Sequence, residues 1–206
     1  MNAMITGPDG KPRCRWCGAA PDFLDYHDIE WGFPVSDDHG LFEKLSLEGF
    51  QSGLSWRTIL AKRENFRAAF HRFDFDRIAS YTEHDLDRLL GDEGIVRHRG
   101  KIEAVINNAQ RAQELVKREG SLAAFIWRYE PDRTQLAKPQ TASTSAQSIA
   151  LSKELKKMGW KFVGPTTVYA FMQAMGLIND HVEDCAIRGE VEAARQHFQR
   201  PGKESY

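Results

Sequence analysis

The segment Leu41–Trp56, LFEKLSLEGFQSGLSW, constrains the fold most strongly because it places a charge on the apolar side of a predicted helix. Leu41, Leu45 and Glu48 recur at i, i+4 and i+7, which is the spacing of one helical face. A carboxylate on a buried face has to be paired, hydrogen-bonded or neutralised, because removing it from water alone is expensive. The pattern therefore predicts a helix that carries a buried acid, Glu48, into the core.

The residues that follow this helix allow two interpretations of Glu48. Small and flexible residues between Gly49 and Ser55 lead to a large aromatic side chain, Trp56. A buried acid beside a glycine-rich turn and an indole could form the floor of a pocket for a flat, electron-poor ring. Alternatively, Glu48 caps a neighbouring helix or pairs with a buried arginine. In both cases the flanking charges, Glu43 and Lys44, are expected to face solvent.

Helical spacing of apolar residues recurs along most of the chain, in residues 55–70, 82–91, 101–118, 121–129 and 146–158. Thr82 and Asp85 resemble a capping box, and Gly120 and Gly159 are expected to end two of these helices. Sustained alternation and runs of β-branched residues, which indicate strands, are almost absent. The sequence therefore predicts an all-α fold.

Length and composition set the domain organisation. The 206 residues are enough for one large domain or one domain with a lobe, and 41% hydrophobic residues suffice for a core. Residues 1–12 are expected to form a flexible leader, residues 13–188 a single unit, and residues 189–206 a polar tail that frays. No apolar run has the length of a membrane span or the pattern of a signal peptide.

Charge and cysteine content narrow the possible functions. Lys and Arg total 28 against 29 Asp and Glu, so any nucleic-acid site has to be a local patch on a protein of net charge −1. Three cysteines, an odd number, argue against a disulfide framework and for a reducing compartment. The protein is therefore expected in the cytoplasm.

His181 and Cys185 lie four residues apart, a common spacing for two metal ligands on one helical face. Cys14 and His27 could supply two more donors, giving a tetrahedral zinc site that ties the N-terminal loop to the C-terminal part of the chain. Such a metal would be structural, because four protein ligands leave no position open for water. From spacing alone Cys17 competes equally with Cys14, and a lone histidine is more often a core residue than a ligand.

The segment Phe162–Thr167, FVGPTT, lies between two predicted helices. A tight glycine-containing hairpin at a helix N-terminus exposes backbone N–H groups that bind phosphate, as in the helix-hairpin-helix motif, although an ordinary αα-hairpin has the same pattern. Nearby basic residues could add a phosphate-binding surface or merely form a solvated face. One cluster contains Lys153, Lys156, Lys157 and Lys161, and the other contains Arg97, His98, Arg99 and Lys101.

The segment Arg13–Trp31 is rich in aromatic side chains but has no clean helical period. Large rings in such a segment have to pack either in a small secondary hydrophobic core or against a ligand. These rings belong to Trp16, Phe23 and Trp31.

In combination, these features resemble the 3-methyladenine DNA glycosylase I family of the helix-hairpin-helix glycosylase superfamily. The resemblance runs from about Arg13 to about Cys185. It is carried by RCRW, YHDIEWG, LFEKLSLEGFQSGLSW, KRENFRAAF, GIVRHRGKIEAVINNA, SKELKKMGWKFVGPTTVYAFMQAMGLINDH and the trailing cysteine. It implies an all-helical DNA repair enzyme, acting as a monomer, that flips the damaged nucleotide out of double-stranded DNA and hydrolyses the N-glycosidic bond of 3-methyladenine.

The resemblance also implies roles for individual residues. The family's pocket glutamate falls on Glu48, its tyrosine on Tyr26, its stacking tryptophan on Trp56 and a further pocket aromatic on Trp16. Phe23 stands where some members have tyrosine. The family's structural zinc ligands fall on Cys14, His27, His181 and Cys185, which favours Cys14 over Cys17. Phosphates would be held by the hairpin and the basic clusters, through Gly164, Thr166, Lys161, Arg97 and Arg99.

The implied chemistry depends on charge. 3-Methyladenine is a cationic base in its nucleotide, and a cation over an aromatic face gains about 0.5–2 kcal/mol, which Trp56 and Tyr26 could supply. Glu48 would accept hydrogen bonds from the base edge, with recognition favoured over a general-base role. No hairpin lysine is placed as a Schiff-base nucleophile, so strand cleavage is not expected. The competing functions are a zinc-stabilised binder of damaged DNA without catalysis, and a helical scaffold that binds no nucleic acid.

Overall fold

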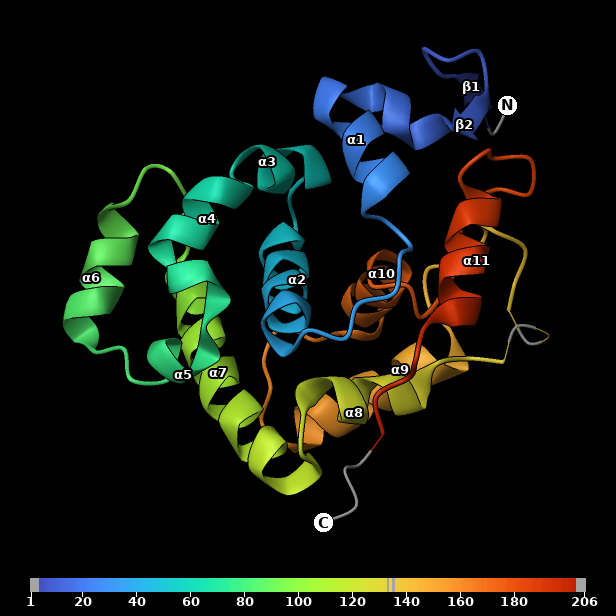
Figure 1. Cartoon of the computed structure of the whole chain (residues 1–206). Coiled ribbons are helices and arrows are strands. Elements are labelled where there is room, and N and C mark those ends of the chain that lie inside the picture. Colours follow the sequence, from blue (N-terminus) through green and yellow to red (C-terminus); the bar gives the residue numbers. More distant parts are fainter. Residues whose placement is uncertain (1–3, 133, 135, 203–206) are drawn as a thin grey trace.

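The computed structural model describes residues 4–132, 134 and 136–202, which are mostly helical (Figure 1). The α-helices are α1 (Pro21–Ile29), α2 (Asp38–Gln51), α3 (Trp56–Ala61), α4 (Arg63–Ala69), α5 (Phe75–Ile78), α6 (Glu83–Gly91), α7 (Arg99–Glu119), α8 (Leu122–Ile126), α9 (Ala146–Lys157), α10 (Pro165–Ala174) and α11 (Arg188–His197). Short 3-10 helices are η1 (Arg15–Ala19), η2 (His71–Phe73) and η3 (Trp127–Tyr129), and the strands are β1 (Met4–Thr6) and β2 (Pro12–Cys14).

Helix α2 runs through the centre of the molecule, where α3, α7, α8 and α10 pack against it (Figure 1). Asp37 is the N-cap of this helix, and its carboxylate accepts a hydrogen bond from the Gly40 N–H at 2.6 Å. Since neighbours cover α2 from several sides, its buried positions run almost without a break from Leu41 to Phe50. Glu48 is therefore enclosed, as its spacing predicts.

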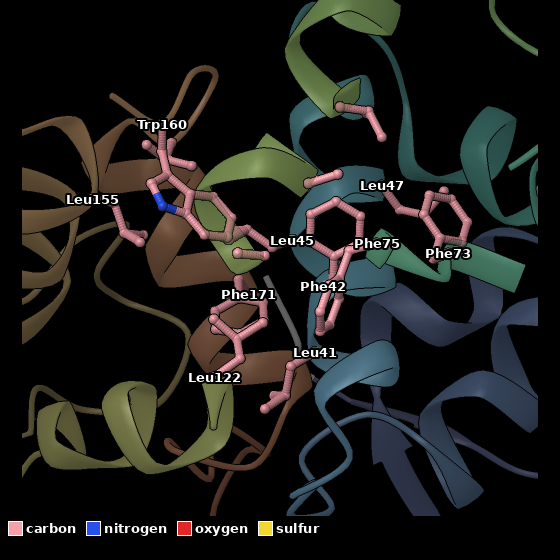
Figure 2. Close-up of a cluster of buried hydrophobic side chains, with 14 of the residues drawn as sticks. Leu41, Phe42, Leu45, Leu47, Phe73, Phe75, Leu122, Leu155, Trp160 and Phe171 are labelled. Atoms are coloured by element: carbon pink, nitrogen blue, oxygen red, sulfur yellow. The ribbon is translucent and has the colours of Figure 1, made fainter. Parts of the chain in front are cut away.

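The main hydrophobic core surrounds α2, and Figure 2 shows part of it. The Phe42 ring of α2 meets the rings of Phe75 and Trp160 edge-on. The distances between ring centroids are 5.7 Å to Phe75 and 6.3 Å to Trp160. Burial of a side chain of this size contributes about 1.5–3 kcal/mol. These contacts tie α5 and the segment after α9 to α2 and so fix the scaffold on which the polar sites are built.

Several helix ends confirm the signals in the sequence. Thr82 and Asp85 form the capping box at the start of α6. Gly120 and Gly159 follow α7 and α9 with φ of 88° and 84°, a left-handed conformation that glycine adopts without strain. Residues 55–70 are helical as predicted, but the helix is divided at Lys62 into α3 and α4.

The N-terminal segment differs from the expected flexible leader. Strands β1 and β2 pair antiparallel, with Met4 opposite Cys14, so the leader contains a hairpin from residue 4 onward. The all-α prediction is therefore wrong in this detail, and the fold is mostly helical. Two three-residue strands are too short to show the alternation by which a strand is recognised. Residues 1–3 of the predicted leader lie outside the described residues.

The predicted tail also differs, because α11 occupies much of it. Val191 and Arg195 are four residues apart and both are buried. Arg195 donates to the Leu177 carbonyl at 3.1 Å and pairs with Glu130 at 2.9 Å. The sequence gives little sign of this helix because a buried arginine takes the place of an apolar residue. Residues 203–206 of the tail lie outside the described residues.

In the part of the chain that the structure describes, every helix is too short or too polar to cross a lipid bilayer.

Candidate active site and metal centre

A cavity of about 150 Å³ opens beside the C-terminal half of α2. Its wall is built from η1, α1, α2, α3, α10 and the residues that follow α1. The lining side chains are Trp16, Tyr26, Trp31, Glu48, Gln51, Trp56, Ala170 and Gln173. Since one water molecule takes about 30 Å³, the space suits a small flat molecule better than an extended chain.

Glu48 is the carboxylate of this wall and is only 6% exposed. Its partner is not an arginine from another element but Lys44, one turn earlier on α2, whose Nζ lies 3.1 Å from Glu48 Oε1. Burial raises the pKa of Glu48, and the Lys44 ammonium opposes this rise. The structure thus combines a pocket position with a buried ion pair.

Lys44 corrects the sequence prediction, which expects it in solvent. It is 5% exposed, its Nζ donates to the Tyr26 hydroxyl at 2.5 Å, and the same atom lies 3.5 Å from the centroid of the Trp56 ring. Burial lowers the pKa of Lys44 to about 8, against the opposing effect of Glu48. Lys44 and Glu48 are i and i+4 on one helix, so a buried Glu48 brings Lys44 to the same face.

The aromatic residues predicted for the pocket lie together. The Tyr26 and Trp56 ring centroids are 5.4 Å apart, and Trp16 meets Tyr26 edge-on at 6.2 Å and Trp31 at 5.0 Å. The Trp56 indole N–H is buried and finds no acceptor among the described residues. A buried donor of this kind is unfavourable until a water or ligand accepts its hydrogen bond.

Phe23 does not line the cavity, in contrast to the prediction that it binds the base. It is buried, and its ring packs against Trp16 with centroids 5.9 Å apart, so it supports a residue of the wall. Four lining residues are not among the predicted base-binding residues: Trp31, Gln51, Ala170 and Gln173. Trp31 belongs to the aromatic-rich N-terminal segment, whereas nothing in the sequence distinguishes the two glutamines from surface residues.

The four predicted metal ligands come together although they lie near opposite ends of the chain. Cys14, His27, His181 and Cys185 are all buried, and their donor atoms lie within 4.8 Å of one another. The Cys185 Sγ lies 3.6 Å from both His27 Nε2 and His181 Nδ1, and the Cys14 Sγ lies 3.7 Å from His181 Nδ1. This cluster could hold a metal ion. Cys17 is buried but does not belong to it.

The histidines of this cluster are oriented by further contacts. His27 Nδ1 lies 2.6 Å from Asp28 Oδ1, and His181 Nε2 lies 3.0 Å from the Trp31 carbonyl oxygen. Contacts of this type fix the rings of metal-binding histidines. The Cys14 thiol beside it lowers the pKa of Cys185, which favours a thiolate there. Trp31 therefore reaches both regions, since its ring also lines the cavity.

The connection between α9 and α10 lies where the sequence predicts a hairpin. Asn108 of α7 holds it: the Asn108 Oδ1 accepts from the Lys161 N–H at 2.8 Å, and its Nδ2 donates to the Lys161 carbonyl at 2.9 Å. Gly164 is the N-cap of α10 and Thr166 is an exposed residue of its first turn, where backbone N–H groups lack helical partners. Nothing in the sequence distinguishes Asn108 from the other polar residues of α7.

The basic residues divide into exposed and buried groups. Lys101 is buried, and its Nζ donates to the carbonyls of Phe50 at 2.8 Å and Ser52 at 2.5 Å, so it holds the turn after α2 and does not contribute to a basic surface. His98 caps α7 by accepting from the Lys101 N–H. The exposed members of the two clusters are Arg97, His98, Arg99, Lys153, Lys156, Lys157 and Lys161.

A family profile, protein sequences and solved structures that resemble this chain are all described as methyladenine glycosylases. The profile of a family described as methyladenine glycosylase matches residues 16–188. Over 177 residues the chain is 48% identical to DNA-3-methyladenine glycosylase 1 of Escherichia coli (strain K12), covering 84% of this chain and 95% of that protein. A crystal structure of 3-methyladenine DNA glycosylase I matches with a TM-score of 0.80 at 47% identity, over 84% of this chain and 98% of the other. A tyrosine-to-phenylalanine variant of such an enzyme in complex with 3-methyladenine matches with a TM-score of 0.79 at 37% identity, over 85% and 97%.

Proposed function

This chain belongs to the methyladenine glycosylase family, and we propose that it is a DNA repair enzyme that hydrolyses the N-glycosidic bond of 3-methyladenine in alkylated double-stranded DNA. The observation that carries the proposal is the position of the Glu48 carboxylate in the wall of the same cavity as Tyr26 and Trp56. The Glu48 carboxylate is buried, and a base stacked inside a duplex cannot bring its edge to it, so the nucleotide has to be flipped out.

Charge selects the damaged base. Methylation at N3 makes adenine cationic while it is attached to the sugar, and a cation over an aromatic face gains about 0.5–2 kcal/mol. Tyr26, Trp56 and Trp16 supply the aromatic surfaces, and the Glu48 carboxylate accepts a hydrogen bond from the exocyclic amine. Neutral adenine loses both the attraction to the rings and the attraction to the carboxylate.

The reaction moves this positive charge from the base to the sugar. The bond between the base nitrogen and C1′ breaks, and its electron pair leaves with the base, which becomes neutral. Water then adds to the cationic C1′ and releases a proton. The Glu48 charge stabilises the developing sugar cation as well as reading the base. Strand cleavage is not part of the proposal, since the Lys44 amine is engaged by Glu48 and Tyr26.

We assign a structural zinc ion to Cys14, His27, His181 and Cys185. With usual zinc bond lengths the donors of a tetrahedral site lie about 3.3 to 3.8 Å apart. The Sγ-to-nitrogen distances of 3.6 and 3.7 Å and the 3.1 Å between His27 Nε2 and His181 Nδ1 are close to this spacing. Two thiols and two imidazoles are a donor set that zinc favours. The ion would join the ends of a single catalytic unit, residues 13–188.

DNA binding is assigned to a helix-hairpin-helix formed by α9, its connection and α10. Backbone N–H groups near Gly164 and Thr166 would hold a phosphate, with Lys161 beside them. Arg97 and Arg99 would contact a second stretch of backbone. These contacts are electrostatic, so the affinity for duplex DNA should fall with salt. The three unpaired, buried cysteines support a reducing compartment, the cytoplasm, as the site of action.

The decisive experiment measures release of the base. Duplex DNA treated with a methylating agent is incubated with the protein, and free 3-methyladenine is quantified by chromatography against a sample without protein. Release supports the enzyme. Binding to methylated duplex without release would indicate a damage-binding protein, and no binding to any DNA at low salt would indicate a helical scaffold.

A further inference from the structure

Lys44 touches three residues assigned to base recognition, yet the reaction described above does not use it. Its Nζ contacts the Glu48 carboxylate at 3.1 Å, the Tyr26 hydroxyl at 2.5 Å and the face of the Trp56 ring at 3.5 Å. Lysine is among the residues least often buried in proteins. Here a cation is built into the base pocket, and its contacts suggest that it serves the pocket.

The Glu48 carboxylate needs a neighbouring positive charge before the damaged base arrives. Burial alone favours the neutral, protonated acid. A protonated acid would present an O–H donor toward the exocyclic amine of the base, which is itself a donor, and would not attract a cation. The charge state of the empty pocket therefore decides whether it can recognise the base.

The other charged groups around Glu48 do not supply this positive charge. Tyr26 of α1 and Glu30, the residue after this helix, lie near the ion pair. Burial raises the pKa of Tyr26, so its hydroxyl stays neutral. From α4, Arg63 donates to both carboxylate oxygens of Glu30, at 2.5 and 2.8 Å, and is neutralised by that partner. Helices α3 and α10 contribute uncharged side chains to the wall, among them Trp56.

We infer that Lys44 is a positioning residue of the base pocket, which holds the Glu48 carboxylate ionised and oriented until the cationic base binds. The same ammonium fixes the Tyr26 hydroxyl, because it donates to that oxygen. The inference rests on the proposed function, in which Glu48 reads the base.

The test compares the pH profiles of single-turnover excision for the wild type, Lys44→Met and Lys44→Arg. Methionine keeps the length of the side chain without its charge, whereas arginine keeps the charge. The acidic limb of the profile reports protonation of Glu48. We expect this limb to move to higher pH by about 1 to 3 pH units in Lys44→Met, the usual effect of removing an opposite charge, and to stay in place in Lys44→Arg.

Lys101→Met is the matched control. It also removes a buried ammonium, but one whose partners are the carbonyls of Phe50 and Ser52. Any loss of rate in this variant should be equal at all pH values. An unchanged limb in Lys44→Met, or an equal shift in Lys44→Arg or Lys101→Met, overturns the inference.

A second measurement separates this inference from the proposed function. The Glu48 side chain is labelled with carbon-13 and titrated by NMR in the free protein, without DNA. A higher titration midpoint in Lys44→Met than in the wild type supports the role of Lys44 whatever the protein does to DNA. A wild-type protein that releases no 3-methyladenine overturns the function, and an unchanged Glu48 midpoint overturns the inference alone.

Discussion

The base pocket and the Cys/His cluster are neighbouring groups of buried polar side chains, but their hydrogen bonding differs. In the cluster the four side-chain atoms that could bind a metal lie close together. The histidine nitrogens that are not among these atoms contact Asp28 and the Trp31 carbonyl. In the pocket Glu48 is paired, yet a cavity remains and the Trp56 N–H has no acceptor among the described residues. Buried polar groups that are all satisfied stabilise a fold, whereas incompletely satisfied groups are suited to take up a ligand. The cluster therefore fits a structural role and the pocket a recognition role.

Loss of the metal should have the largest effect, and mainly on folding. In Cys185→Ala one donor is missing, and the other buried donors lose the ion that would satisfy them. We expect a loss of about 4 kcal/mol or more in the free energy of unfolding, with a decrease in Tm of about 10 °C or more. Thermal unfolding followed by circular dichroism, together with elemental analysis for zinc, measures both consequences.

Cys17→Ala is the matched control, because Cys17 is a buried cysteine outside the cluster. It should keep its zinc and lose about 1 kcal/mol. If Cys185→Ala were as stable as Cys17→Ala, or if the wild type contained no zinc, the structural role of the cluster would be refuted.

Glu48→Gln should have the reverse effect, with chemistry lost and the fold retained. Glutamine keeps the shape but removes the charge that attracts the base and stabilises the sugar cation, so single-turnover excision should fall by roughly 10²-fold or more. Lys44 loses its charge partner, but with a pKa of about 8 in the wild type it can give up its proton, which limits the destabilisation.

The control for this variant is Glu43→Gln, on the same helix. Glu43 pairs with Arg67 at 2.7 Å and does not line the cavity, so its excision rate should stay close to that of the wild type. Wild-type excision by a folded Glu48→Gln protein would remove Glu48 from the site.

The two regions also differ in how far the sequence predicts them. Residue type and spacing indicate the two histidines and Cys185 as candidate ligands, but only the family resemblance favours Cys14 over Cys17. The pocket is predicted only in part. Lys44 is assigned to solvent because lysine usually lies there, although its i, i+4 relation to Glu48 places both on one face.

Other features depend on tertiary contacts and cannot be read from local patterns. The two glutamines of the wall and Asn108 have their roles only because distant segments approach them. Helix α11 is missed because Arg195 finds a carbonyl and a carboxylate inside the protein. The helices in residues 55–70, 82–91, 101–118, 121–129 and 146–158 are predicted well, because caps and apolar spacing act within a few residues.

The Lys44–Glu48 pair should make the pocket more attractive to cations at high pH. Below pH about 8 the pair has no net charge, and above it Lys44 is neutral and Glu48 leaves a net charge of −1. The affinity for a permanently cationic N3,N9-dialkylated adenine should therefore rise with pH, by roughly tenfold between pH 7 and 9, equivalent to about 1.4 kcal/mol. Tryptophan fluorescence titrations measure this affinity.

Lys44→Arg sharpens this prediction, because arginine stays protonated over the whole range. The affinity of Lys44→Arg for the cationic ligand should not change near pH 8. The other titratable groups near the pair, Tyr26, Glu30 and Arg63, are the same in this variant and in the wild type, so only residue 44 differs. A rise of equal size in Lys44→Arg would assign the titration to another group.

Trp31→Phe should have the smallest effect, and it tests whether the two regions act independently. Phenylalanine keeps a ring in the wall and leaves the backbone carbonyl that accepts from His181 Nε2, so zinc content should be unchanged. The smaller ring loses part of the contact with Trp16, now 5.0 Å between centroids, which is worth about 1 kcal/mol. We therefore expect about fivefold weaker binding of 3-methyladenine, measured by calorimetry. If zinc affinity fell by the same factor, the cluster would depend on the pocket wall, since the Trp31 ring also lies 4.6 Å from the His181 ring, and the two regions would have to be treated as one site.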